Sequence, residues 1–494
     1  MMNVKAISLD IGKALQINAL FMLLSLGVSV ACDFDSGFTP LLLSFLITSI
    51  AGSFPLIFVK DSQQETTQEG FVTIVLSWLL SFIFGMLPYV LWGGEFTLMN
   101  AWFESVSGYT TTGSTILTDI EALPKSLLMW RSSTHYIGGL GVVVFLLLIL
   151  PDTSTFKFKL SHLELSSIAK EGYRYKSVKT VRVITLTYIG LTIAEFFCLW
   201  AAGMTPFDAI NHAFSTIATG GFSTKNTSIL FYDSNAINII IMIFMALAAM
   251  HFGVIYASIA TRSFKPLRHP ITRYYFLVIL VLSILTTLSL TIQGGQRLPE
   301  ALMSGSFQVV SFISTTGFGQ ADNSLWPIMA NAILLFAGFH CGCSGSTTGG
   351  IKADRMYISF KAIAGDFRKR LSPSAVFRTR VGDACVAEDT VSSIFLFIVL
   401  YIIVMFLSFV AVLLCGVDIA EAFSGTLASL GNVGPGLGTL GTMGNYASQP
   451  EFAKFIYTMD MFLGRLEIFP ILVVMSLIFN KKAGETICKA ATAG

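Results

Sequence analysis

The chain has 494 residues, of which 54% are hydrophobic and 12% are charged, and its mean hydropathy is +0.72. Soluble domains carry about 25% charged residues, so this chain has too few charges to cover a surface that faces water. The composition excludes an ordinary soluble enzyme and indicates a protein embedded in membrane lipid. The formal net charge of +2 gives no reason to expect a nucleic-acid partner, and we predict none.

Four uncharged stretches are long enough to cross a bilayer as helices. At a rise of 1.5 Å per residue, a helix of ~20 residues spans a hydrocarbon core of ~30 Å. The first stretch lacks a small-residue cleavage site and is followed at once by a second, so we expect a membrane helix and not a cleaved signal peptide. These stretches are Ala14–Cys32, Phe38–Val59, Phe71–Trp92 and Ile394–Cys415.

After two lead helices in residues 1–67, one pattern recurs four times: an apolar span, a short amphipathic segment, a loop rich in Thr and Gly, and a second apolar span. The short segments are too short to cross the bilayer, which is typical of half-helices that dip in and return. The sequence therefore predicts an all-α polytopic membrane protein with four helix–pore loop–helix repeats. We assign the repeats to residues 68–177, 178–272, 273–390 and 391–494.

The second span of each repeat follows its loop. We expect it at residues 124–150 in the first repeat and, as one helix, at Ala236–Ala260 in the second. In the third repeat it begins at Trp326 and is interrupted, and in the fourth it runs as one helix over Glu451–Phe479. With the lead helices this arrangement gives ten membrane spans.

The four loops carry the chemistry. Irregular backbone is tolerated at membrane depth only where it lines protein or water, so the loops are expected to share an aqueous cavity. Backbone carbonyls can replace the hydration shell of a cation, and glycine permits the backbone angles that such a strand requires. The corresponding tripeptides of the four loops are the predicted filter residues: Thr111-Thr112-Gly113, Ala218-Thr219-Gly220, Thr315-Thr316-Gly317 and Asn432-Val433-Gly434.

Lys and Arg mark the cytoplasmic side of a membrane protein. They gather in Leu150–Arg182, in Arg262–Arg273, in Lys352–Asp389 and at the C-terminus, in Lys481, Lys482 and Lys489. The segments that hold the four loops are nearly free of them. We therefore expect both termini in the cytoplasm, all four loops outside, and parallel repeats around a pseudo-fourfold pore.

A polar tract interrupts the second span of the third repeat. A tract of Gly, Ser, Thr and Cys cannot face lipid, so we predict an intramembrane loop that crosses the cavity below the filter as a gate, with a simple hinge as the alternative. Arg465 lies in the last apolar span, where an ionised side chain must face water or a partner. It is expected either to repel cations or to form an ion pair, for instance with Glu467. The predicted gate residues are Gly342, Gly345, Ser346, Thr347, Thr348, Gly349, Gly350 and Arg465.

The loop motifs at residues 107–114, 218–224, 314–319 and 431–435 resemble the four filters of the Trk/Ktr/HKT superfamily of potassium transporters, as do Gly345–Lys352 and the Gly464-Arg465 pair. The resemblance covers almost the whole chain, and the two lead helices are similar to the TrkH branch and not to the shorter KtrB branch. In plant relatives a serine in the first filter accompanies sodium transport, so Gly113 favours potassium. Asn432-Val433-Gly434-Pro435 departs from Thr-Thr-Gly but is similar to the fourth filter of the family.

The resemblance implies uptake of K⁺ as cargo, with no bound cofactor, across the inner (cytoplasmic) membrane of a bacterium. It also implies a homodimer with one pore per protomer, surrounded by membrane lipid. A cytoplasmic, TrkA-like ring that binds nucleotides is the expected regulatory partner. The sequence does not specify a coupling ion.

Competing interpretations are weaker. An ion-coupled secondary transporter with alternating access commonly uses inverted repeats, whereas all repeats here begin on the same side. The sequence Gly436–Gly441 fits a dinucleotide-binding pattern but follows a pore loop and no strand. Gly342–Gly345 fits the GxSG pattern of intramembrane proteases, yet no histidine follows His340. We therefore expect no enzyme, and a non-conducting receptor or structural subunit is the remaining alternative.

Overall fold

The computed structural model describes residues 3–59, 66–149, 177–372, 378–382 and 384–477. Within them the chain is mainly helical, and the only sheet is an antiparallel hairpin of β1 (Arg380–Val381) and β2 (Ala384–Cys385). The long helices are α1 (Val4–Ala31), α2 (Phe38–Phe58), α3 (Thr67–Gly85), α6 (Lys125–Ile149), α9 (Ser177–Ala201), α13 (Pro270–Ile292), α16 (Ala353–Leu371) and α17 (Glu388–Leu414). The shorter ones are α4 (Leu87–Trp92), α5 (Leu98–Tyr109), α10 (Pro206–Ile217), α11 (Asn235–Ala248), α12 (Phe252–Ala260), α14 (Leu298–Ile313), α15 (Ile328–His340), α18 (Ile419–Leu430) and α19 (Glu451–Arg465).

Six spans in the described part are long and apolar enough to cross a membrane: α1, α2, α3 with α4, α9, α13 and α17. They include all four predicted stretches. Helix α1 begins at Val4, ten residues before the predicted start, because Asn3 accepts a hydrogen bond from the amide of Ala6 and caps the helix. Likewise, the predicted repeat boundaries at residues 273 and 391 fall in the first turns of α13 and α17.

A short helix precedes each of the four loops: α5, α10, α14 and α18, with 12 to 16 residues each. Their starts follow from the sequence. Thr97, Thr205 and Asp418 each accept a hydrogen bond from a backbone amide in the first turn of α5, α10 and α18. A proline in the first turn of α10 and α14 costs no hydrogen bond there.

Two spans predicted as single helices are broken. The segment predicted at Ala236–Ala260 forms α11 and α12, whose axes differ by 102°. The freed backbone groups are bonded by a distant segment: the amide of Phe252 donates to the carbonyl of Gly345, and that of Cys343 donates to the carbonyl of Ala249. This pairing depends on residues about a hundred positions away, which is why the local sequence did not indicate the break.

The last span is broken as well. Helix α19 ends at Arg465 instead of continuing through Phe479, and a second helical segment covers residues 469–477. Between them Glu467 and Ile468 adopt left-handed φ angles of 58° and 63°, a conformation that costs non-glycine residues about 1–2 kcal/mol each. The charge of Glu467 is paired with residues of another element, described below, which holds this turn in place.

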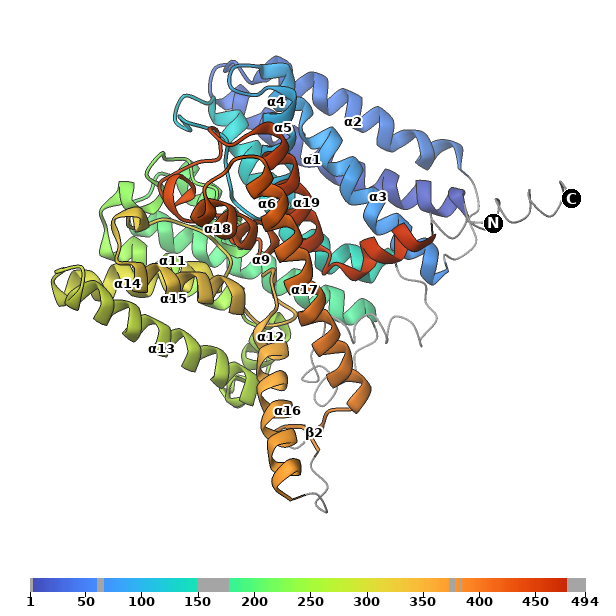
Figure 1. Ribbon diagram of the computed structural model, residues 1–494. Helices are drawn as coiled ribbons and strands as arrows, with labels where there is room; N and C mark the ends of the chain where they lie inside the picture. Colours follow the sequence, from blue (N-terminus) through green and yellow to red (C-terminus); the bar gives the residue numbers. More distant parts are fainter. Residues whose placement is uncertain (1–2, 60–65, 150–176, 373–377, 383, 478–494) are drawn as a thin grey trace, which may run out of the picture.

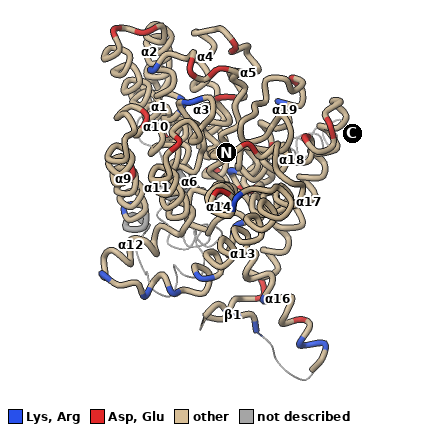
Figure 2. The backbone as a smooth tube through the Cα atoms, turned by 90° about the vertical axis from the view of Figure 1, so that its left-hand side faces the viewer, with Lys and Arg blue, Asp and Glu red and all other residues tan. Residues whose placement is uncertain are grey.

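The elements form one bundle from which α16 and the lower part of α17 project (Figure 1). Helices α1, α2 and α3 pack together at one side, and α13, α14 and α15 pack together at another. Lys and Arg lie mainly at the end of the molecule formed by α12, α16 and the hairpin (Figure 2). Much of the predicted basic stretch 150–182, and Lys481, Lys482 and Lys489, lie outside the described residues.

Candidate functional site

The four loops share one backbone conformation. One residue beyond the end cap of each short helix, a residue has a left-handed φ of 52° to 56°, and its amide donates to the carbonyl three residues back, in the last turn of the helix: Thr111, Thr219, Thr315 and Asn432. The amide of the next residue donates to a carbonyl five residues back, at 2.8 to 3.0 Å, in all four loops. Two residues after the first, a glycine has a φ of 78° to 97°: Gly113, Gly221, Gly317 and Gly434.

This shared geometry corrects the predicted alignment of the second loop by one residue. Ala218 closes helix α10, as Thr110, Ser314 and Gly431 close the other short helices. The segment equivalent to Thr111–Gly113 is therefore Thr219-Gly220-Gly221 and not Ala218–Gly220. The sequence offers two adjacent glycines here, and only the φ angles show that Gly221 takes the left-handed position.

The four loops meet in a closed ring. A methyl group built on Gly113 would lie 2.0 Å from the carbonyl oxygen of Gly220, and one on Gly221 would lie 2.0 Å from that of Thr316. The same construction on Gly317 reaches the carbonyl of Val433 at 2.2 Å. A methyl group on Gly434 would lie 2.4 Å from the carbonyl oxygen of Thr112, so the fourth loop contacts the first and closes the ring. At each junction only glycine lets neighbouring strands approach this closely.

Direct hydrogen bonds join the fourth loop to the first. The side-chain amide of Asn432 donates to the hydroxyl of Thr112 at 3.0 Å, and the hydroxyl of Ser114 donates to the carbonyl of Gly434 at 3.0 Å. The hydroxyl of Tyr446 also donates to the Gly434 carbonyl, at 3.0 Å. These bonds fix the spacing of segments that lie 320 residues apart in the chain.

One face of the ring opens into a small hollow of about 60 Å³. Its lining includes the four equivalent glycines Gly113, Gly221, Gly317 and Gly434. Gly220 does not appear among the lining residues, in agreement with the corrected alignment. All four loops therefore contribute the same backbone position to one shared space.

Two oxygens at equivalent positions of the ring have no hydrogen-bond partner among the described residues. They are Oγ1 of Thr111 in the first loop and Oδ1 of Asn432 in the fourth, and both side chains are buried. Buried oxygens without a partner are rare because leaving one unpaired costs about 1–3 kcal/mol.

The predicted gate loop lies against the opposite face of the ring. The hydroxyl of Thr347 donates to the carbonyl of Ile217 at the end of α10, at 3.1 Å. The amide of Gly349 donates to the hydroxyl of Thr315 at 3.3 Å. A methyl group on Gly349 would lie 2.6 Å from Oδ1 of Asn432. The loop thus touches the second, third and fourth units next to the first residue of their loops.

The remaining predicted gate residues pack the loop tightly. Methyl groups on Gly342, Gly345 and Gly350 would lie 2.8 Å from the carbonyl of Ala249, 2.6 Å from the His251 ring and 2.2 Å from the sulfur of Cys341. The hydroxyls of Ser346 and Thr348 bond to each other at 2.8 Å inside the loop. No room is left for even one added methyl group at these three glycines.

Arg465 lies in the same layer and connects the loop to the first unit. Its guanidinium donates to the carbonyl of Thr347 and, at 2.8 Å, to the carbonyl of Gly138 in α6. The side chain is buried. The sequence suggested an ion pair between Arg465 and Glu467 as one option. In the structure Glu467 instead pairs with Lys352, at 2.7 Å, and with Arg355.

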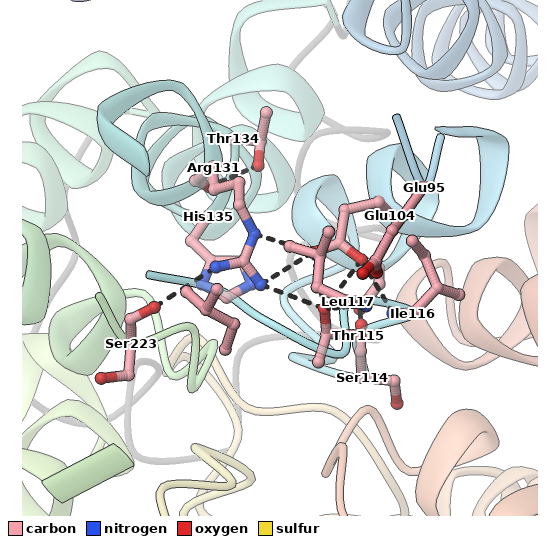
Figure 3. A network of polar contacts seen from close by, with 12 residues as sticks. Glu95, Glu104, Ser114, Thr115, Ile116, Leu117, Arg131, Thr134, His135 and Ser223 are labelled. Carbon is pink, nitrogen blue, oxygen red and sulfur yellow. Dashed lines mark hydrogen bonds and ion pairs between the residues drawn. The ribbon is translucent and has the colours of Figure 1, made fainter. Parts of the chain in front are cut away.

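A buried ion pair next to the ring was missed at the level of sequence. Nε of Arg131 in α6 lies 2.7 Å from Oε1 of Glu104 in α5, and both side chains are fully covered (Figure 3). Arg131 also lines the hollow. The available signal was a charged residue inside the apolar stretch 125–149, since such residues seldom occur at membrane depth without a role.

The fold and this ring define a multi-pass helical membrane protein with a site made by four equivalent loops. A model of the TrkH family, described as a cation transport protein, matches residues 40–485. The chain is 36% identical over 417 residues to the Trk system potassium uptake protein TrkH of Salmonella typhimurium, covering 84% of this chain and 86% of that one. It is 35% identical over 426 residues to TrkH of Escherichia coli strain K12, covering 85% and 87%.

A solved structure agrees with these sequence relationships. The crystal structure of the potassium transporter TrkH from Vibrio parahaemolyticus superposes with a TM-score of 0.87 at 30% identity, over 96% of this chain and 98% of that one. The chain belongs to the TrkH family of cation transport proteins. The predicted resemblance is thereby confirmed.

Proposed function

We propose that this chain takes up potassium ions across the cytoplasmic membrane through the ring of four loops, which acts as the selectivity filter. The observation that carries the proposal is the convergence of four equivalent glycines on one hollow. The relatives of the chain named above are potassium uptake proteins, which supports the choice of ion. In this proposal the four repeats surround a pseudo-fourfold axis that passes through the ring.

Selection in this filter depends on neutral dipoles. The filter residues are Thr111–Gly113, Thr219–Gly221, Thr315–Gly317 and Asn432–Gly434, and none of them carries a charge. Carbonyl and hydroxyl oxygens replace the water around a K⁺ ion, and their number and spacing decide which ion gains most. The short helices end at the ring, so their C-terminal partial negative charges add to the attraction.

The gate in this proposal consists of the loop from Gly342 to Gly350 together with Arg465. Support comes from the tight packing of the loop below the ring and from the Arg465 guanidinium bound to Thr347. A fixed positive charge in a dehydrated pathway opposes the passage of K⁺. Opening therefore requires the loop and Arg465 to move away together.

The assembly and orientation complete the proposal. The chain forms a homodimer in the inner membrane with both termini in the cytoplasm, and a TrkA-like nucleotide-binding subunit controls the gate from that side. The Lys and Arg residues near α12 and α16 support this orientation (Figure 2). A monovalent cation that enters along the membrane potential gains about 2.3 kcal/mol per 100 mV, so uptake needs no fuel site in this chain.

The second candidate is an ion-coupled transporter with alternating access. The broken spans at residues 249–251, 341–352 and 466–468 favour it, because discontinuous helices are common in such proteins. The ring argues for the filter. Alternating access requires two halves of the protein that move relative to each other, whereas the ring connects all four loops in one continuous contact.

The decisive experiment measures uptake of ⁸⁶Rb⁺ into vesicles that contain the purified chain, with and without the nucleotide-binding subunit. The filter proposal expects uptake that K⁺ inhibits much more strongly than Na⁺ and that increases with an inside-negative potential. Uptake that requires a proton or sodium gradient at fixed potential would instead favour alternating access. Absence of uptake under every condition would contradict both.

A further inference from the structure

The pair formed by Arg131 and Glu104 lies where the first and second filter loops meet (Figure 3). Beyond its bond to Glu104, the Arg131 guanidinium donates to the hydroxyl of Thr115 at 3.3 Å and to the carbonyl of Ser223 at 3.3 Å. Its central carbon lies 3.9 Å from the centre of the Phe222 ring. A single side chain therefore contacts residues within two positions of the filter glycines of both loops.

Glu104 completes the connection from the other side. Its carboxylate accepts hydrogen bonds from the hydroxyl of Thr115 at 3.0 Å and from the amide of Ile116 at 3.1 Å. The carboxylate thus binds the first loop segment and the guanidinium at once. Both charges are withdrawn from water, with exposed fractions of 1% for Arg131 and 0% for Glu104.

A guanidinium in this position poses an electrostatic problem for a cation pathway. Arg131 lines the same hollow as the four filter glycines. An unbalanced positive charge there would repel an arriving cation, and the repulsion is strong where the surroundings exclude water. Glu104 is fully buried against the guanidinium and cancels its charge at short range.

We propose that Arg131 and Glu104 are a charge-balanced clamp, in which Arg131 sets the spacing of the first two filter loops and Glu104 keeps its charge from repelling the transported ion. Both are positioning residues, since neither lies among the filter oxygens. This inference rests on the proposed function. The proposal assigns two effects to the pair, one on the spacing of the loops and one on the net charge beside the hollow, and different variants of the pair distinguish them.

The charge effect is tested with Glu104→Gln, which keeps the size and hydrogen-bonding oxygen of the side chain but leaves Arg131 unbalanced. In ⁸⁶Rb⁺ uptake into vesicles, KM should increase about ten-fold, which corresponds to about 1.4 kcal/mol. The maximal rate should change much less, because the filter strands stay in place. An unchanged KM would overturn the proposal.

The spacing effect is tested with the double variant Glu104→Gln/Arg131→Gln, which is neutral but lacks the contacts to Ser223 and Phe222. Its KM for Rb⁺ should return to within about two-fold of the unmodified chain. Its preference for Rb⁺ over Na⁺ should decrease about ten-fold. A double variant with a KM about ten-fold above that of the unmodified chain, or with unchanged selectivity, would overturn the proposal. This comparison holds even if the single variant is absent from the membrane.

A second ion pair at the same hollow provides a matched control. Lys225 also lines the hollow and lies 3.7 Å from Glu121, but the two side chains are 21% and 40% exposed. Solvent screens an exposed pair, so Glu121→Gln should change KM by less than about two-fold. An equal effect of Glu121→Gln and Glu104→Gln would overturn the claim that burial matters. Lack of uptake by the unmodified chain would contradict the proposed function and not this inference.

Discussion

At the scale of single residues, the glycines of the proposed filter are constrained by both conformation and space. Gly113 has a φ of 81°, and an added methyl group would lie 2.0 Å from the Gly220 carbonyl. Gly113→Ser should therefore push the first two loops apart and reduce the preference for Rb⁺ over Na⁺ about ten-fold in vesicle uptake. Gly221→Ser should act in the same way, because Gly221 is the equivalent position.

Gly190 in α9 is a suitable control for this prediction, since it has an ordinary φ and open space where a side chain would go. Gly190→Ser should leave ion preference unchanged. Unchanged selectivity in Gly113→Ser would contradict the assignment of these residues to the filter. A defect in Gly113→Ser without one in Gly221→Ser would contradict the corrected alignment.

Arg465 offers a second prediction for a single residue. If its charge closes the pathway, Arg465→Ala should raise ⁸⁶Rb⁺ flux several-fold, whereas Arg465→Lys keeps the charge and should keep flux low. Both carbonyls that Arg465 binds, on Thr347 and Gly138, lose that donor in the alanine variant. Reduced flux or loss of folded protein in Arg465→Ala would show that the bonds serve the structure and that the charge is no barrier.

At the scale of elements, the loop between α15 and α16 is the proposed gate. Deleting several of the glycines in Gly345–Gly350 should remove the packing against Thr315 and Asn432 and leave the pathway open without the nucleotide-binding subunit. The measurement is the ratio of ⁸⁶Rb⁺ uptake with and without that subunit, which should approach one. A ratio equal to that of the unmodified chain would contradict the gate assignment.

The broken last span is held by an ion-pair cluster between elements. Glu467 binds Lys352 at 2.7 Å and Arg355, so Glu467→Gln leaves two largely buried cations without their carboxylate. Breaking a buried pair from one side costs about 3 kcal/mol or more, and thermal unfolding in detergent should occur at a lower temperature. The exposed pair of Arg370 and Asp366 is the control, and Asp366→Asn should shift the transition little.

At the scale of the whole molecule, the proposed orientation in the membrane rests on the distribution of charge. Ser324 is exposed near the third loop, and Ser372 is exposed at the end of α16. In a variant without native cysteines, a membrane-impermeant maleimide added to intact cells should label Ser324→Cys and not Ser372→Cys. Permeabilised cells should label both. The reverse pattern would place the four loops in the cytoplasm and contradict the proposed direction of uptake.

Local features of the sequence determine much of the architecture. Length and hydropathy locate α1, α2, α9, α13 and α17, because a bilayer demands about 20 apolar residues in succession. Caps and prolines locate the short helices, and repetition identifies the loops. Such features depend on neighbouring residues only, so a single sequence contains the information that fixes them.

Tertiary structure decided the features that depend on distant partners. The breaks near His251 and Glu467 exist because segments about a hundred residues away bind the freed backbone groups or the charge. The choice of Gly221 over Gly220 depends on φ angles set by the neighbouring loop. The pairing of Arg131 with Glu104 needs two helices to pack at one depth. Composition and periodicity do not specify which distant strand or charged side chain a residue contacts across the bundle. The ring of four loops is formed by such long-range contacts.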